Sequence, residues 1–121
     1  MAAKEIKIGD KTVKMIATGA TPIYYKDYFH EDLIEMLNSN ISDDGEITLS
    51  LDKLLQVAFI MAKQGEGSSY DEMYALTKKD FVEWSDGFSF TGMTAVGPEI
   101  LTTLVENHKS EVELKKTTDE K

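Results

Sequence analysis

The sequence contains no cysteine, which excludes disulfide bridges, thiolate metal sites and cysteine nucleophiles. Long apolar runs are also missing. The longest, residues 57–62, is far too short to cross a bilayer, and the first residues do not form the apolar stretch of a signal peptide. Positive charge is scarce, with 13 Lys and Arg against 22 Asp and Glu, so the net charge is −9. Because this balance repels polyanions, we expect neither nucleic acid nor an anionic membrane as a partner.

The length of 121 residues is enough for one domain with a modest hydrophobic core. Apolar residues make up 41% of the chain, which is too many for a disordered polymer. We therefore predict a single globular domain over residues 1–110. Residues 111–121 contain only Val112 and Leu114 as apolar side chains among charged and polar ones, so a flexible charged tail is predicted there.

A β-hairpin is predicted at residues 5–17. Ile6 and Ile8 alternate with polar residues, as do Val13 and Met15, and the segment 9–11 (Gly-Asp-Lys) between them has the composition of a turn. Because an isolated hairpin is only marginally stable in water, its apolar face must pack on another part of the protein.

Helices are predicted where apolar residues recur at helical spacing after residues that favour helix starts, at about 22–38, 51–64, 70–76, 78–86 and 98–109. Thr21 is expected to cap the first one, and the Gly-, Ser- and Thr-rich stretch 87–95 is predicted as a loop. The helix at 51–64 is apolar on nearly every side, so it should be central, and a charge at Leu55 or Phe59 should unfold the domain. The predicted fold class is mainly α (α+β), an N-terminal hairpin packed on a compact bundle of four or five helices.

Residues that could carry chemistry do not form a recognisable site. The segment 40–47 (Asn-Ile-Ser-Asp-Asp-Gly-Glu-Ile) partly matches a calcium loop, but Leu51 stands where the bidentate Glu is needed. We favour a polar connection between two helices there and keep calcium binding as a further alternative. His30 and His108 have no second ligand at zinc spacing, and no nucleophile elbow or phosphate-binding loop is present. The prediction is a protein that is not an enzyme, with no catalytic residue, cofactor or metal.

Two tyrosines are the candidate partner-binding residues. Tyr24 and Tyr28 lie one helical turn apart, off the apolar arc that Tyr25, Phe29 and Leu33 form on the same predicted helix. Aromatic side chains exposed in this way are typical of protein interfaces. We favour the alternative that another element covers them, because a small domain needs most of its large apolar side chains for its core.

Two further segments carry a resemblance to a known family. They are residues 20–29 (Ala-Thr-Pro-Ile-Tyr-Tyr-Lys-Asp-Tyr-Phe) and 57–64 (Val-Ala-Phe-Ile-Met-Ala-Lys-Gln). Together with the preceding strand pair they make most of residues 5–105 similar to the tail assembly chaperones of siphophages and prophages of Gram-positive bacteria. One departure is His30, where the family pattern has Gly, and it puts the local turn in question.

The resemblance implies a non-catalytic protein that binds the tape-measure protein, keeps it soluble and helps recruit tail-tube subunits. It implies action in the host cytoplasm and absence from the mature virion, with the tape-measure and tail-tube proteins as partners; self-association stays open. It also implies a longer product of ribosomal frameshifting, for which the codons of Lys115 and Lys116 are a suitable place. Apart from the resemblance, the alternative is a small acidic adaptor or inhibitor that binds a host protein.

Overall fold

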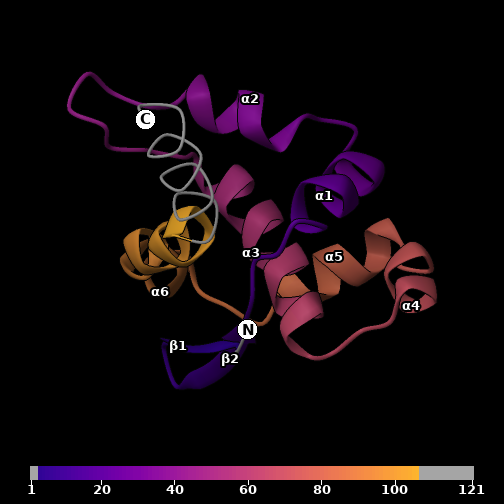
Figure 1. Cartoon of the computed structure of the whole chain (residues 1–121). Coiled ribbons are helices and arrows are strands. Elements are labelled where there is room, and N and C mark those ends of the chain that lie inside the picture. Colours follow the sequence, from indigo (N-terminus) through magenta and orange to yellow (C-terminus); the bar gives the residue numbers. More distant parts are fainter. Residues whose placement is uncertain (1–2, 107–121) are drawn as a thin grey trace.

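A computed structural model describes residues 3–106, in which two strands are followed by a series of helices (Figure 1). The elements are β1 (Lys4–Ile8), β2 (Lys11–Met15), α1 (Thr21–Phe29), α2 (Leu33–Asn38), α3 (Leu51–Gly65), α4 (Tyr70–Tyr74), α5 (Lys78–Ser85) and α6 (Phe90–Ala95). Residues 97–106 are helical as well. The predicted fold class, mainly α with an N-terminal hairpin packed on helices, is confirmed. The predictions for residues 107–109 and for a tail at 111–121 lie outside the described residues.

The hairpin forms where the alternation of apolar residues predicts it. β1 and β2 are antiparallel, with Ile6 opposite Val13, and a two-residue turn of Gly9 and Asp10 joins them. The turn is one residue shorter than predicted, and Gly9 takes the positive φ of 65° that its first position requires. The apolar face packs inward, since β2 lies along α3 and β1 contacts α6. The Ile16 amide, just beyond β2, donates to the Met61 carbonyl of α3 at 3.2 Å.

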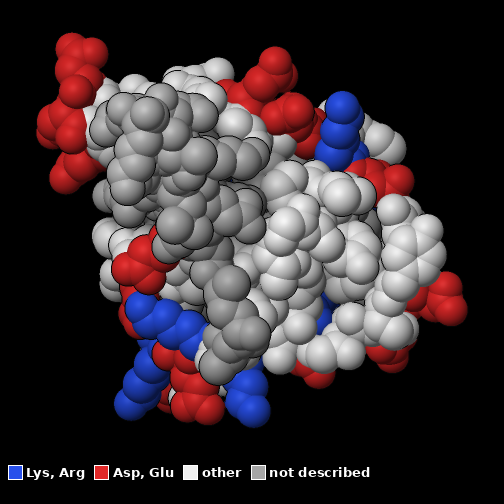
Figure 2. All heavy atoms as spheres, in the orientation of Figure 1, with Lys and Arg blue, Asp and Glu red and all other residues white. Residues whose placement is uncertain are grey.

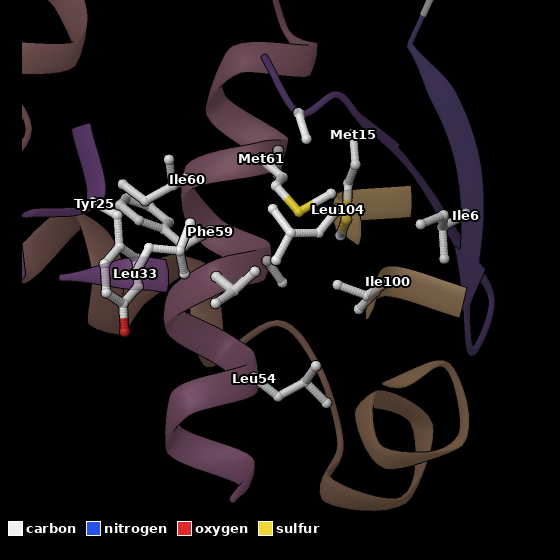
Figure 3. Packing of buried hydrophobic residues seen from close by; sticks show 14 of the residues in the cluster. Ile6, Met15, Tyr25, Leu33, Leu54, Phe59, Ile60, Met61, Ile100 and Leu104 are labelled. Carbon is white, nitrogen blue, oxygen red and sulfur yellow. The ribbon is translucent and has the colours of Figure 1, made fainter. Parts of the chain in front are cut away.

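α3 is the central element, as its sequence predicts. Residues 57–62 are buried without interruption, which places apolar side chains on opposite sides of the helix. Figure 3 shows Tyr25, Leu33 and Ile60 packed on one side of α3 and Met61 on the other, facing the hairpin and residues 97–106. Leu55 packs against the core but is only partly buried, because the face of α3 between α5 and α6 is open to solvent, so unfolding by a charge at this position stays a prediction.

The predicted helix at 22–38 is in fact two helices. His30 ends α1 in the left-handed conformation, with φ 59° and ψ 37°, and its amide donates to the Lys26 carbonyl at 2.8 Å. Asp32 then caps α2 by accepting from the Glu35 amide at 2.9 Å. The sequence pattern does not reveal the break between α1 and α2, because the apolar residues of both helices continue one helical arc. His30 therefore occupies the kind of position that usually favours Gly.

The predicted loop at 87–95 contains a helix, α6. Ser89 caps it, accepting from the Gly92 amide at 2.9 Å, and Met93 is buried. Gly92 faces the hairpin: a Cβ there would lie 3.8 Å from the Gly9 amide nitrogen and from the Ile8 side chain. The composition suggested a loop because the Gly and Ser residues that usually mark loops here supply a cap and a close helix contact.

Helix starts were predicted with mixed success. Ser69 with Glu72 and Thr77 with Asp80 form complete capping boxes at the starts of α4 and α5. Thr21 is not the cap of α1. It is buried within the first turn, where its hydroxyl donates to Gln64 Oε1 of α3 at 2.6 Å. Tertiary hydrogen bonding thus takes precedence over local capping at this position.

A polar network connects α1, the α1–α2 connection and α3. The Tyr25 ring is buried, and its hydroxyl lies 3.1 Å from Glu31 Oε1 and 2.9 Å from Gln56 Oε1, so its single proton goes to one of them at a time. Lys53 pairs with the same Glu31 oxygen at 2.6 Å. Burial, and next the hydrogen bond to Glu31, raises the pKa of Tyr25. The folded state therefore favours the neutral phenol.

Tyr25 should make the protein less stable at alkaline pH. An unfolded tyrosine loses its proton near pH ~10, whereas the folded state retains it, so the free energy of unfolding falls as the pH rises above about 10. Tyr25→Phe cannot titrate and should flatten this fall, at a cost of about 1 kcal/mol near neutral pH for the lost hydrogen bond. Urea unfolding from neutral to alkaline pH measures the difference. If the free energies of unfolding of the wild type and Tyr25→Phe fell in parallel with rising pH, Tyr25 would not be the group that causes the alkaline loss of stability.

Candidate binding surfaces

Tyr28, one of the two predicted binding residues, is used inside the domain. Its ring is half-buried and packs edge-on against Phe29, with centroids 4.7 Å apart. It also lies tilted against the Phe59 ring at 5.6 Å between centroids. Its hydroxyl donates to the carbonyl of Thr77, at the start of α5. Burial is the main cause that raises the pKa of Tyr28. This tyrosine thus attaches α1 to α3 and α5, as the alternative interpretation of its sequence position expects.

Tyr24, the second predicted residue, lies at the edge of an aromatic surface. Its ring is half-buried and meets Tyr74 of α4 edge-on at 6.0 Å between centroids. Tyr74 in turn packs on Tyr70 at 4.6 Å, and Tyr70 is 65% exposed. We call Tyr24, Tyr70 and Tyr74 the tyrosine surface. It brings together two segments far apart in sequence, which is why reading a single helix could find only one of its members.

A groove opens on another part of the molecule, between the start of α3, the C-terminal half of α5 and α6. Its volume is about 290 Å³. Most of its walls are apolar and come from three elements and the α5–α6 connection: Leu51, Leu55, Phe81, Val82, Phe88 and Met93. Phe90, the first residue of α6, also lines the groove and is nevertheless 78% exposed. Large apolar side chains are thus left open to solvent around a concave site.

The polar residues of the groove are acidic or neutral. Asp52 and Asp86 carry carboxylates, and Ser85 and Ser89 carry hydroxyls; none of the described residues that line the groove is basic. A hydrogen bond from the Ser50 hydroxyl lowers the pKa of the Asp52 carboxyl, which keeps it ionised. The Ser85 hydroxyl oxygen is buried, and within residues 3–106 it has no hydrogen-bond partner. The groove therefore combines apolar walls with negative charge and an unused hydroxyl.

A wider hollow, of about 710 Å³, lies between segment 45–49, the start of α3 and residues 97–106. Leu49, Leu101 and Val105 are among its apolar walls. Glu106, the last described residue, lies on its rim.

The connection from α2 to α3 carries the segment that partly matches a calcium loop. Ile41 and Ile47 form an isolated antiparallel bridge, and Gly45 turns the chain between them with φ 87°. Within residues 3–106 there is no group of three or more His, Asp or Glu side chains placed to hold a metal ion. Nor does any helix in this part of the chain have the length and apolarity of a membrane span.

The sequence prediction missed the groove and two of the three members of the tyrosine surface. Tyr70 and Val82 fell in the predicted helices at 70–76 and 78–86, and Phe90 fell in the predicted loop at 87–95. One local signal was present: Phe90 directly follows a Ser in a polar stretch, which places a large apolar side chain in the exposed first turn of a capped helix.

Comparisons with protein-family models, curated proteins and solved structures find no match to this chain. We therefore infer the function from the surfaces described above and from the resemblance carried by residues 20–29 and 57–64.

Proposed function

We propose that the chain is a tail assembly chaperone of a siphophage or prophage, which binds the tape-measure protein, keeps it soluble and helps recruit tail-tube subunits. The observation that carries the proposal is Phe90, which lines an apolar groove and yet is 78% exposed. Exposed apolar surface beside a groove is typical of sites that take the apolar face of another polypeptide. The resemblance at residues 20–29 and 57–64 supplies the identity of that polypeptide.

The charge of the chain fits this role. A tape-measure protein is long and helical, and its apolar stripes stay uncovered until the tail tube closes around it. A chain with a net charge of −9 would add repulsion between complexes and so oppose their aggregation. Many copies bound with moderate affinity would cover the stripes and still allow release during assembly. The proposal places this activity in the host cytoplasm, with the chaperone absent from the mature virion.

An alternative is a small acidic adaptor or inhibitor that binds a basic site on a host protein. An exposed acidic connection favours it: Figure 2 shows acidic side chains at the corner formed by the α2–α3 connection, and lysines mixed with acidic side chains over the hairpin. Asp43, Asp44 and Glu46 are the acidic residues of that connection, and all three are exposed. This surface would recognise charge, whereas the groove would recognise apolar side chains.

Co-expression with the tape-measure protein encoded by the same phage or prophage tests the proposal. We expect the tape-measure protein to be mostly insoluble alone, to become soluble with this chain, and to be captured with it by affinity purification. The adaptor alternative predicts instead that the tape-measure protein stays insoluble and that high salt releases whatever host protein is captured. A tape-measure protein equally insoluble with and without the chain would refute the chaperone function.

A further inference from the structure

We infer that the groove between α3, α5 and α6 binds an amphipathic helix whose apolar face carries a neighbouring Lys or Arg, and that this helix belongs to the tape-measure protein. The inference deepens the proposed function by assigning a surface and a partner chemistry, and it rests on that function for the identity of the partner. Two properties of the groove support it: its size and its charge.

The size of the groove selects side chains rather than a small-molecule ligand. About 290 Å³ is at the lower end of the range of ligand pockets, which is roughly 300–1,000 Å³. It has room for one or two apolar side chains of a helix lying across it. Val82 and Phe90, which are 53% and 78% exposed, line the same groove and extend the apolar contact beyond it. A helix with apolar residues at positions i, i+3, i+4 and i+7 has a matching face.

The charge of the groove selects a cation next to those apolar residues. Asp52 and Asp86 both line it, and Asp86 follows directly after the C-terminal end of α5, where the helix dipole adds negative potential. The last turn of α5 contains no basic residue, although the Lys11 ammonium of β2 donates to the Gly87 carbonyl at 2.8 Å and lies over the Phe88 ring, where it offsets part of this potential. A Lys or Arg of the partner would therefore be attracted mainly by the Asp52 and Asp86 carboxylates beside an apolar wall.

The only tryptophan of the chain reports on the groove. Trp84 lies on α5, and its ring packs on Phe88, which lines the groove, with centroids 4.8 Å apart. A helix that displaces water around Phe88 should therefore change the fluorescence of Trp84. No label is needed, and the full-length chain can be used.

The experiment titrates the full chain with two model helices of about 18 residues, both with Leu at i, i+3, i+4 and i+7, one with Lys and the other with Glu on the polar face. We expect the Leu/Lys helix to change Trp84 fluorescence saturably and the Leu/Glu helix to bind about tenfold more weakly or not at all. Phe90→Asp should weaken binding of the Leu/Lys helix about tenfold, and Asp86→Asn should weaken it several-fold.

The control is Ile23→Asp, which adds the same charge to a side chain that is 61% exposed on α1 and does not line the groove. It should bind the Leu/Lys helix as well as the wild type does. If the Leu/Lys helix were held only by non-specific attraction to an acidic protein, Phe90→Asp and Ile23→Asp would both bind it at least as tightly as the wild type does. Equal or tighter binding by Phe90→Asp would overturn the inference.

The results of these titrations and of the co-expression experiment can differ, so the inference and the proposed function are tested separately. If the tape-measure protein stays soluble with both wild type and Phe90→Asp, the chaperone function holds and the groove is not its binding site. If Phe90→Asp weakens binding of the Leu/Lys helix but the wild-type chain does not keep the tape-measure protein soluble, the groove takes basic helices and the assignment to the tape-measure protein is wrong.

Discussion

Replacing Phe59 by alanine should reduce the free energy of unfolding by about 3–5 kcal/mol. The side chain is completely buried in α3, and its ring meets three other rings, Tyr28, Phe81 and Trp84, with centroids 5.3–5.6 Å away. Removing it loses transfer free energy and leaves a cavity among groups from α1 and α5 that cannot all close in. Because a domain of this size is typically stable by only about 5–15 kcal/mol, the variant should be close to unfolding.

The matched control is Phe90→Ala, the same chemical change at a side chain that is 78% exposed. It should change the free energy of unfolding by less than about 0.5 kcal/mol, because no core contact is lost. Urea unfolding measures both, and we expect the midpoint of Phe59→Ala to be lower by about 2 M. Similar midpoints for the two variants would mean that α3 is not the centre of the core.

Gly65→Ala should be the second strongly destabilising change, at about 3 kcal/mol, although it adds only a methyl group. Gly65 is the last residue of α3, and a Cβ there would lie 2.1 Å from the Lys14 carbonyl oxygen and 2.9 Å from the Met15 amide nitrogen. Both atoms belong to the backbone of β2, so no side chain can rotate away. Either the hairpin or the end of α3 must move. This movement should weaken or break the hydrogen bond from the Ile16 amide to the Met61 carbonyl.

Gly19→Ala is the control for this change. A Cβ at Gly19 would meet nothing within 4 Å, so its effect should stay below about 1 kcal/mol. Thermal unfolding of the two variants, with far-ultraviolet circular dichroism to confirm that each is folded, gives the comparison. If Gly65→Ala has the same melting temperature as Gly19→Ala, β2 does not lie against the end of α3.

Much of this fold follows from local sequence signals. The alternation around Gly9 predicts the hairpin, and the all-round apolarity of residues 57–62 predicts that α3 is buried. Ser69 and Thr77 predict the starts of α4 and α5, because each side chain can satisfy backbone amides only three residues away. Signals of this kind depend on neighbours in sequence, and the structure preserves them.

The errors have a shared physical cause, which is that tertiary contacts decide what local signals leave open. His30 takes a left-handed conformation between two helices that bury the same face, so the apolar spacing runs through the break unchanged. Thr21 hydrogen-bonds to α3 instead of capping α1. The segment at 87–95, whose composition suggested a loop, forms α6 and packs on β1 of the hairpin. None of these contacts can be inferred from residues within one turn.

The binding surfaces were the least predictable part. Tyr24 is half-buried at the edge of the core, and Tyr74 meets it from a helix about fifty residues later in the chain. The groove is made by half-buried side chains of α3, α5 and α6, whose spacing on each separate helix is that of ordinary core residues. Only their arrangement in space shows that Leu55 and Val82 face a shared opening.

The most direct test of the central claim, that this chain binds an apolar helical polypeptide, is the mass of the complex recovered after co-expression with the tape-measure protein. Size-exclusion chromatography with light scattering should show one soluble particle that contains the tape-measure protein and several copies of this chain. The claim would be contradicted if the chain eluted alone at the mass of its own assembly while the tape-measure protein remained in the pellet.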